Sequence, residues 1–393
     1  MKKSILSLIT LVALAQTANA IDETLNPLIT AMPSLSIAPD ARSAGMGDIG
    51  VATDADLNSM YWNAAKYSYM QSKGGITANY TPWLRKLVSD IDLAHIAGYY
   101  NFGDLGGGIA ASFTYFSLGD VQLQDASGSE WGTVRPNEWS LDLAYFRKLH
   151  EYVSMSVALR FMYSDLNNGV NTSTSSAGEM YPAWTMAADI ALYYRQPIEL
   201  PMGPSYFSLG FTLKNLGGKM SYDKGATSNF IPATMRIGVN YELPFDKYNS
   251  LTFGVQADKL MVPSRKSKYA DGEDGQWSTE GYTNLSSVKG IFQSFADAPG
   301  GAAEEFKEVR WGAGLEYSYN KQFFARFGYS YENFYKGNRN YLTVGAGFHL
   351  SIFSLDVAYC IGLASTNPLD QTMRFTLGFD LAGIKDLVDN RKK

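Results

Sequence analysis

Three glycines near the N-terminus have the spacing of a dinucleotide-binding turn, Gly45-x-Gly47-x-x-Gly50. Such a turn binds pyrophosphate only where it follows a strand and opens a helix within a strand–helix–strand unit. No strand pattern precedes these glycines, and no such unit surrounds them. We therefore expect them to let the backbone pack closely against its surroundings, and we do not expect a nucleotide site.

A second motif, Asp54-x-Asp56-x-Asn58, begins like a calcium-binding loop of the EF-hand type. That loop needs glycine at its sixth position and an acid at its twelfth. Ser59 and Ala65 stand at these positions. The polar side chains of this stretch are instead expected to bond to neighbouring backbone amides.

The residue types that most often act as nucleophiles, bases or zinc ligands are few and scattered. The chain has three histidines, His95, His150 and His349, and one cysteine, Cys360. The histidines lack metal-ligand spacing, and no Gly-x-Ser-x-Gly elbow is present. We expect no enzymatic activity, no cofactor and no metal site. A single cysteine also excludes an intramolecular disulfide.

The first twenty residues have the three parts of a secretory signal peptide. Lys2 and Lys3 precede an apolar stretch over residues 5–15, and Ala18-Asn19-Ala20 supplies the cleavage site. The mature chain is expected to begin at Ile21, where the absence of cysteine argues against a lipoprotein. Removal of two lysines leaves 31 basic residues against 38 acidic ones, a net charge of −7, which argues against nucleic acid as a partner.

Hydrophobic alternation at period two dominates the rest of the chain and predicts transmembrane strands. In residues 371–381, for example, Met373, Phe375 and Leu377 alternate with Arg374 and Thr376. The same pattern predicts fourteen strands, an even number with mostly sufficient lengths for an all-β, antiparallel outer-membrane barrel. The predicted strands are 74–81, 91–102, 107–118, 138–148, 151–164, 183–195, 206–215, 233–242, 250–260, 309–319, 322–333, 340–350, 351–361 and 371–381.

Connection lengths support the barrel independently. Those after the even-numbered strands are short, whereas 119–137, 165–182, 216–232 and 261–308 are long. Outer-membrane barrels place short turns in the periplasm and long loops outside the cell, and a soluble sandwich has no reason to keep this parity. We therefore expect a Gram-negative outer-membrane protein with a long extracellular loop over 261–308 and a periplasmic tail over 382–393.

The alternation also places charged side chains in the barrel lumen. Two interpretations remain open: a network of ion pairs that holds an inner segment, or an arginine-rich receptor for a carboxylate. The charges predicted to face inward are Arg160, Arg236, Arg310, Arg326, Arg374, Asp189, Glu316 and Asp356.

Residues 21–73 do not alternate, and they resemble the N-terminal plug of the FadL-like family of long-chain fatty-acid transporters. That family also has fourteen-stranded barrels, so the resemblance implies a plug followed by a barrel over residues 74–381. Ala64 stands where the family has proline after asparagine. The residues that match the plug motif are Arg42, Gly45, Gly47, Asp48, Asp54 and Asn63.

The long loop resembles a narrower branch, the PorV and PorQ group of the type IX secretion system. The similarity lies in residues 289–301 and in Glu304-Glu305-Phe306, after Val262-Pro263. It implies a protein that binds the C-terminal domains of secreted cargo at the type IX translocon. It also implies delivery of that cargo to a cell-surface attachment complex that contains a PorU-type sortase.

Two functions from different classes follow. In the first, a helical ridge that includes Val288 binds cargo through apolar anchors while nearby acids steer basic cargo. The alternative is a FadL-like transporter of fatty acids or other hydrophobic molecules, and co-purification of secreted protein or of lipid would distinguish the two. The predicted cargo-binding residues are Phe292, Phe295, Asp297, Glu304, Glu305 and Phe306.

Overall fold

The structure, a computed structural model, describes residues 25–103, 107–124, 129–168, 180–350, 352–363, 367 and 369–381. The predicted signal peptide and the predicted tail over 382–393 lie outside these ranges. Within them, none of the helices combines the length and the apolar composition needed to cross a membrane.

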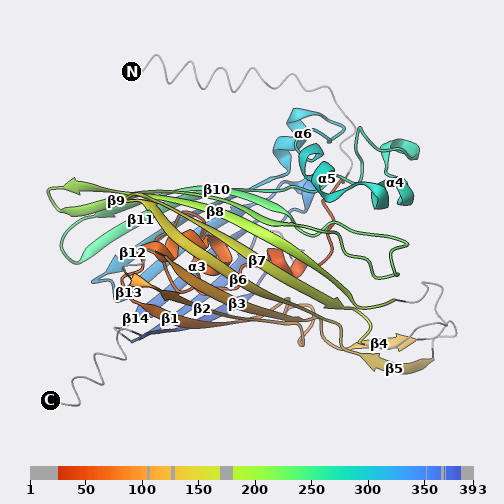
Figure 1. The fold of residues 1–393 in the computed structure, drawn as a ribbon. Coiled ribbons are helices and arrows are strands. Elements are labelled where there is room, and N and C mark those ends of the chain that lie inside the picture. Colours follow the sequence, from red (N-terminus) through yellow and green to blue (C-terminus); the bar gives the residue numbers. More distant parts are fainter. Residues whose placement is uncertain are drawn as a thin grey trace.

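Fourteen antiparallel strands close into a barrel, which confirms the predicted fold (Figure 1). Each strand pairs with its neighbours along the chain, and β1 pairs with β16 from Gly75↔Asp380 to Tyr80↔Phe375. The barrel strands are β1 (Gly74–Pro82), β2 (Asp92–Asn101), β3 (Gly108–Ser117), β6 (Asn137–His150), β7 (Val153–Asp165), β8 (Ala183–Leu200), β9 (Gly203–Gly217), β10 (Thr234–Pro244), β11 (Asn249–Leu260), β12 (Val309–Tyr319), β13 (Phe323–Tyr331), β14 (Tyr341–His349), β15 (Phe353–Gly362) and β16 (Met373–Asp380).

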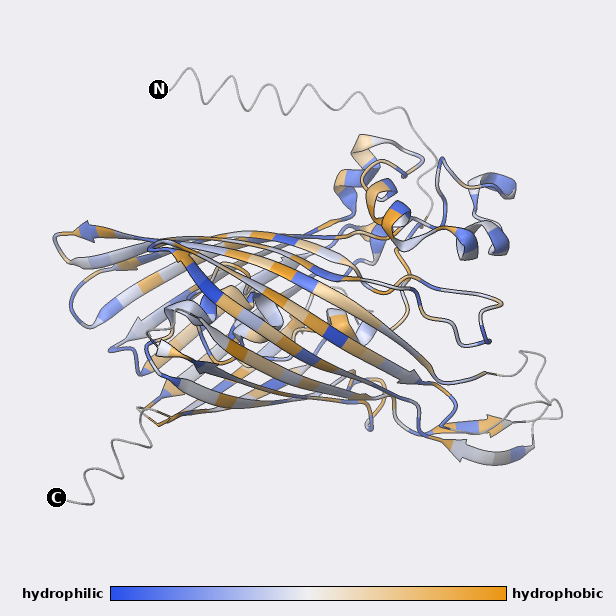
Figure 2. Ribbon diagram, viewed as in Figure 1, coloured by the Kyte–Doolittle hydropathy of each residue, from blue (hydrophilic) through white to orange (hydrophobic). Residues whose placement is uncertain are grey.

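The two faces of the wall have the polarity that the alternation predicts. On β16, Phe375 and Leu377 are exposed on the outer surface, whereas Arg374 and Thr376 are buried on the lumenal side. Figure 2 shows apolar and polar residues alternating along the strands. An outer surface of this kind matches a lipid environment, because contiguous apolar patches of such size are not stable in water.

Strand ends differ from the prediction in two places. The loop over 119–137 contains a hairpin, β4 (Val121–Gln124) and β5 (Glu130–Val134), which forms a separate two-stranded sheet. Strand β8 continues past the predicted end at 195, through Pro197, to Leu200. Proline disfavours a central strand, but β7 ends its pairing at Tyr194, so beyond that residue β8 has a free edge.

All short turns gather at one end of the barrel and all long connections at the other (Figure 1). The long-connection end carries η4 (Glu273–Gly275), α4 (Thr279–Asn284), α5 (Ser287–Gln293), α6 (Ala302–Lys307) and η5 (Phe334–Lys336). We assign this end to the cell exterior, because outer-membrane barrels keep their long loops there.

The N-terminal segment, residues 25–73, runs through the barrel from the outer end to the periplasmic end. Asn26 N–H donates to Tyr335 O and Ala31 N–H to Phe230 O, both in long outer connections. The segment then enters β1 at Gly74, beside the short turns. Along this path it forms η1 (Pro33–Ser36), α2 (Ala41–Gly45), α3 (Ser59–Trp62) and η2 (Ala64–Tyr69) inside the wall (Figure 1).

The facing of β16 gives a direct test of the barrel wall. Leu377→Arg places a charge on the lipid side and is expected to cost about 2–4 kcal/mol near the bilayer midplane. Thr376→Ser is the control, because a serine hydroxyl can still bond to Ala41 N–H and Asn79 Oδ1. Urea unfolding in lipid vesicles measures both variants, and equal midpoints for Leu377→Arg and the wild type would contradict the facing.

Candidate functional site: the filled lumen and the extracellular helical loop

Glu316 on β12 is the centre of the lumenal ion-pair network. Its carboxylate accepts two hydrogen bonds from Arg42, Nη2 to Oε1 at 2.8 Å and Nε to Oε2 at 3.1 Å. Arg326 Nε donates to the same Oε2 at 2.6 Å, and its Nη1 reaches Asp356 Oδ1 at 2.6 Å. Arg42 also binds Asp56 at 2.9 Å, so one buried chain of charges joins the N-terminal segment to three strands of the wall.

The other inward arginines also have carboxylate partners. Asp48 of the N-terminal segment accepts from Arg374 Nη1 at 2.9 Å and from the Tyr341 hydroxyl. The five arginines that the sequence places inward all lie within 3.5 Å of a carboxylate, which fits the ion-pair interpretation of the lumen better than a free carboxylate receptor. The remaining pairs are Arg160–Asp142, Arg160–Asp189, Arg236–Asp258 and Arg310–Asp258.

Glycines allow the N-terminal backbone to touch the wall directly. A Cβ on Gly47 would lie 2.6 Å from Tyr329 O, and the residue has φ +76°, a conformation that favours glycine. On the wall side, a Cβ on Gly328 would lie 2.0 Å from Gly47 N. The motif glycine Gly45 faces Gly345 in the same way, at 3.1 Å. These glycines therefore serve backbone packing, as expected for residues without a nucleotide to bind.

The end of the motif forms a tight turn despite the substitution at Ala64. Asn63 Oδ1 accepts from Ala65 N–H, and its Nδ2 donates to Val51 O and Leu192 O. Ala64 is then the first residue of η2, a position at which proline is favoured because no N–H bond is needed there. Alanine fills the same place, so the turn is kept. Asp54 contacts Arg195 on β8 at 3.3 Å.

The extracellular loop over 261–308 folds around a small apolar core. Phe230, Val262, Tyr282 and Leu285 are buried together, and Trp277 packs against them. Helix α5 rests on this core through Gly290, because a Cβ there would lie 2.4 Å from the Phe230 ring. The side of α5 opposite Gly290 therefore points away from the barrel.

That outward side carries large apolar residues in contact with solvent. Val288 is 66% exposed and Phe292 74% exposed, and Phe295 follows one turn later at 43%. On α6, Phe306 is 65% exposed, with its ring centroid 5.9 Å from that of Trp311 on the barrel rim. The four predicted apolar residues of the loop thus form an accessible surface, here termed the apolar ridge (Val288, Phe292, Phe295 and Phe306).

The acids of the loop lie elsewhere than the sequence suggested. Asp297 is 0% exposed, Glu305 is buried, and Glu304 donates no free face because Lys336 Nζ binds it at 2.6 Å. Lys259 Nζ lies 2.9 Å from Glu305. These carboxylates anchor the loop, so the expectation that they steer basic cargo from the solvent does not fit this geometry.

Burial sets the ionisation of these acids. It raises the pKa of Asp297 to about 7, although the Ser264 N–H lowers it, and Glu308 and Glu305 raise it further. Burial also opposes ionisation of Glu304, yet hydrogen bonds from Lys336 Nζ and the Gly300 N–H lower its pKa overall.

Sequence reasoning missed the basic partners and one acid of this anchor. Lys259 ends β11, Lys336 lies in η5, and Glu308 follows α6, where it binds both lysines at 2.7 and 3.0 Å. The signal available was the inward parity of Lys259 on its strand. Nothing in the sequence indicates that the distant Lys336 reaches the same point.

Comparison with known proteins places this architecture in a family. The family model for the type IX secretion system protein PorV matches residues 20–267. The chain belongs to the PorV family. It is therefore an outer-membrane protein of a Gram-negative bacterium with a place in the type IX secretion system, and no curated protein matches it in sequence.

Solved structures show the same barrel fold at low identity to this PorV-family chain. The toluene transporter TodX of Pseudomonas putida aligns with a TM-score of 0.52 at 10% identity, over 91% of this chain and 99% of its own. A FadL homologue of Pseudomonas aeruginosa aligns at 0.42 and 10%, over 90% and 99%. The likeness to TodX shows a shared fold and carries no information on ligands.

The lumenal network of this PorV-family barrel can be tested at its centre. Glu316→Gln removes the charge shared by Arg42 and Arg326, and we expect a loss of about 3 kcal/mol. That is the low end for a broken buried pair, because each arginine keeps one other acid. Asp120→Asn breaks an exposed pair with Arg135 and should cost less than about 1 kcal/mol. Denaturant unfolding in detergent compares them, and equal losses would contradict the central role of Glu316.

Proposed function

We propose that this protein is a non-enzymatic carrier of the type IX secretion system. It binds the C-terminal domains of secreted cargo at the translocon and carries them to a cell-surface attachment complex with a PorU-type sortase. Membership in the PorV family supports the assignment to the system, and the observation that carries the binding step is the apolar ridge on the extracellular loop.

The ridge has the features of a protein-binding surface. Val288 and Phe292 are among the most exposed apolar side chains outside the barrel wall, and they lie on a helix whose opposite side is fixed by Gly290 against Phe230. A rigid support reduces the entropy lost on binding, and large apolar side chains supply most of the energy at such interfaces. The ridge therefore suits a partly apolar protein partner better than it suits water.

The lumen gives less support to transport of hydrophobic molecules. We infer that residues 25–73 act as a plug, since their charges pair with the wall and their glycines touch it. Among the described residues, the interior cavity lined by Arg42, Leu57 and Glu316 has a volume of about 320 Å³ and opens toward the periplasmic turns. Two further spaces deeper inside measure about 10 Å³ each. A fatty-acid path would require the plug to move.

A double substitution on the ridge tests the proposal. Val288→Ser with Phe292→Ser removes apolar area without touching the buried side of α5, so the barrel should fold normally. Loss of one or two central apolar anchors costs upwards of about 1.4 kcal/mol, which is about tenfold in affinity. We expect at least that reduction in the secreted protein that co-purifies with the barrel.

The matched control is Leu87→Ser, which changes an equally exposed apolar residue in the connection between β1 and β2. Wild-type recovery of secreted protein by the ridge variant would refute the ridge as the cargo site. Co-purification of lipid in place of secreted protein, with both variants and the wild type, would favour the transporter alternative.

A further inference from the structure

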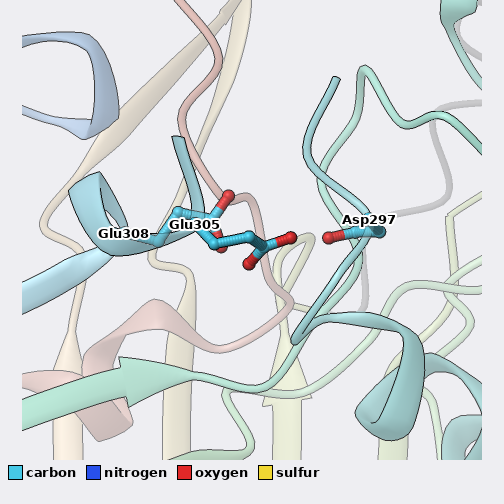
Figure 3. A group of neighbouring side chains, drawn as sticks. All are labelled: Asp297, Glu305 and Glu308. Carbon is cyan, nitrogen blue, oxygen red and sulfur yellow. The ribbon is translucent and has the colours of Figure 1, made fainter. Parts of the chain in front are cut away.

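Three buried carboxylates of the extracellular loop converge on one point. Asp297 follows α5, Glu305 lies in α6 and Glu308 follows it, and Figure 3 shows the three carboxylates turned toward a common space. One oxygen from each lies within 4.8 Å of the other two. That span is about twice a calcium–oxygen bond, so a single ion between them could reach all three.

One of these oxygens has no partner. Asp297 Oδ2 accepts the Ser264 N–H at 2.8 Å, but Oδ1 is buried and makes no hydrogen bond within the described part of the chain. Asp297 is 0% exposed, so bulk water does not satisfy this oxygen. A buried carboxylate oxygen without a donor is unfavourable, which indicates a group that belongs there.

The charges around this point do not balance. Four carboxylates, those of Asp297 and Glu304 together with Glu305 and Glu308, meet two ammonium groups from Lys259 and Lys336. Two negative charges remain, the number that one divalent cation would neutralise. The lysines do not exclude an ion, because each carboxylate oxygen has two lone pairs and Lys259 occupies one on each glutamate that it contacts.

We propose that Asp297, Glu305 and Glu308 bind a divalent cation, with calcium preferred. The ligands are all hard oxygen donors, and calcium accepts irregular sets of such donors completed by water, whereas magnesium demands near-octahedral geometry. The raised pKa of Asp297 is consistent with a carboxylate that needs a positive partner. With three protein ligands, affinity should resemble that of extracellular calcium modules, on the order of 10⁻⁴–10⁻³ M.

Such an ion would join α6 to the segment after α5 and to Ser264 at the end of the barrel strand. It would thereby fix the two helices that carry the apolar ridge. The proposal concerns the anchoring of the loop and stands whether or not the ridge binds cargo.

The test uses the full mature chain, refolded in detergent without lipopolysaccharide, which itself binds divalent cations. Calcium chloride is titrated by calorimetry, and thermal unfolding is followed in calcium, in magnesium and in chelator. We expect calcium to bind and raise the unfolding temperature more than magnesium does. Asp297→Asn should weaken calcium binding by at least about tenfold, because ligand charge sets affinity. It should unfold in chelator no earlier than the wild type, since it removes an unpaired buried charge.

Glu280→Gln is the matched control, an exposed acid of the same loop that should bind calcium as the wild type does. Terbium luminescence of the wild type, with displacement by calcium, supplies a measurement that needs no variant, and Glu305→Gln supplies a second variant. Equal calcium responses of the wild type and Asp297→Asn would overturn the proposal. So would an absence of calcium binding at every pH, which would mean that Asp297 holds a proton.

Discussion

The need to neutralise buried charge inside a narrow barrel is the constraint on which the rest of this structure depends. Glu316 and Arg326 face a lumen from which water is largely excluded, where an unpaired charge would cost several kcal/mol. Arg42 comes from outside the wall to complete the group, and Asp48 does the same for Arg374. The wall and the N-terminal segment are therefore each incomplete without the other.

Charges fix the position of the segment, and glycines determine how closely it lies. The contact of Gly47 with Gly328 leaves no room for a side chain on either strand or segment, so the backbone itself fills the lumen. Because so little space is left inside, recognition of a large partner has to take place at the rim. The loop over 261–308 supplies that surface, since Gly290 turns the buried side of α5 inward and leaves the apolar ridge outside.

Most of the fold follows from the sequence because a lipid-facing wall imposes strict alternation, as in Met373 to Asp380. The ends are less predictable: Pro197 suggested a stop, but the pairing of its neighbours left it a free edge. The site was predicted unevenly. Helical spacing indicated the exposed face of α5, whereas the burial of Asp297 depends on Lys259 and Lys336, which approach from distant connections and leave no local pattern.

The outer rim and the lumen are parts of one connected structure. Asn26, at the start of the described chain, donates its side-chain N–H groups to Lys266 O and to Glu304 Oε1, and its backbone N–H to Tyr335 O. Glu304 in turn binds Lys336, which belongs to the acidic anchor of the loop. The segment that pairs with Glu316 in the lumen therefore also holds the base of the helical loop. A displacement of this segment would break contacts at both ends of the barrel, so opening the lumen would also disturb the loop that carries the ridge. This coupling makes a permanently filled barrel with a rigid outer surface the arrangement that satisfies the greatest number of buried groups.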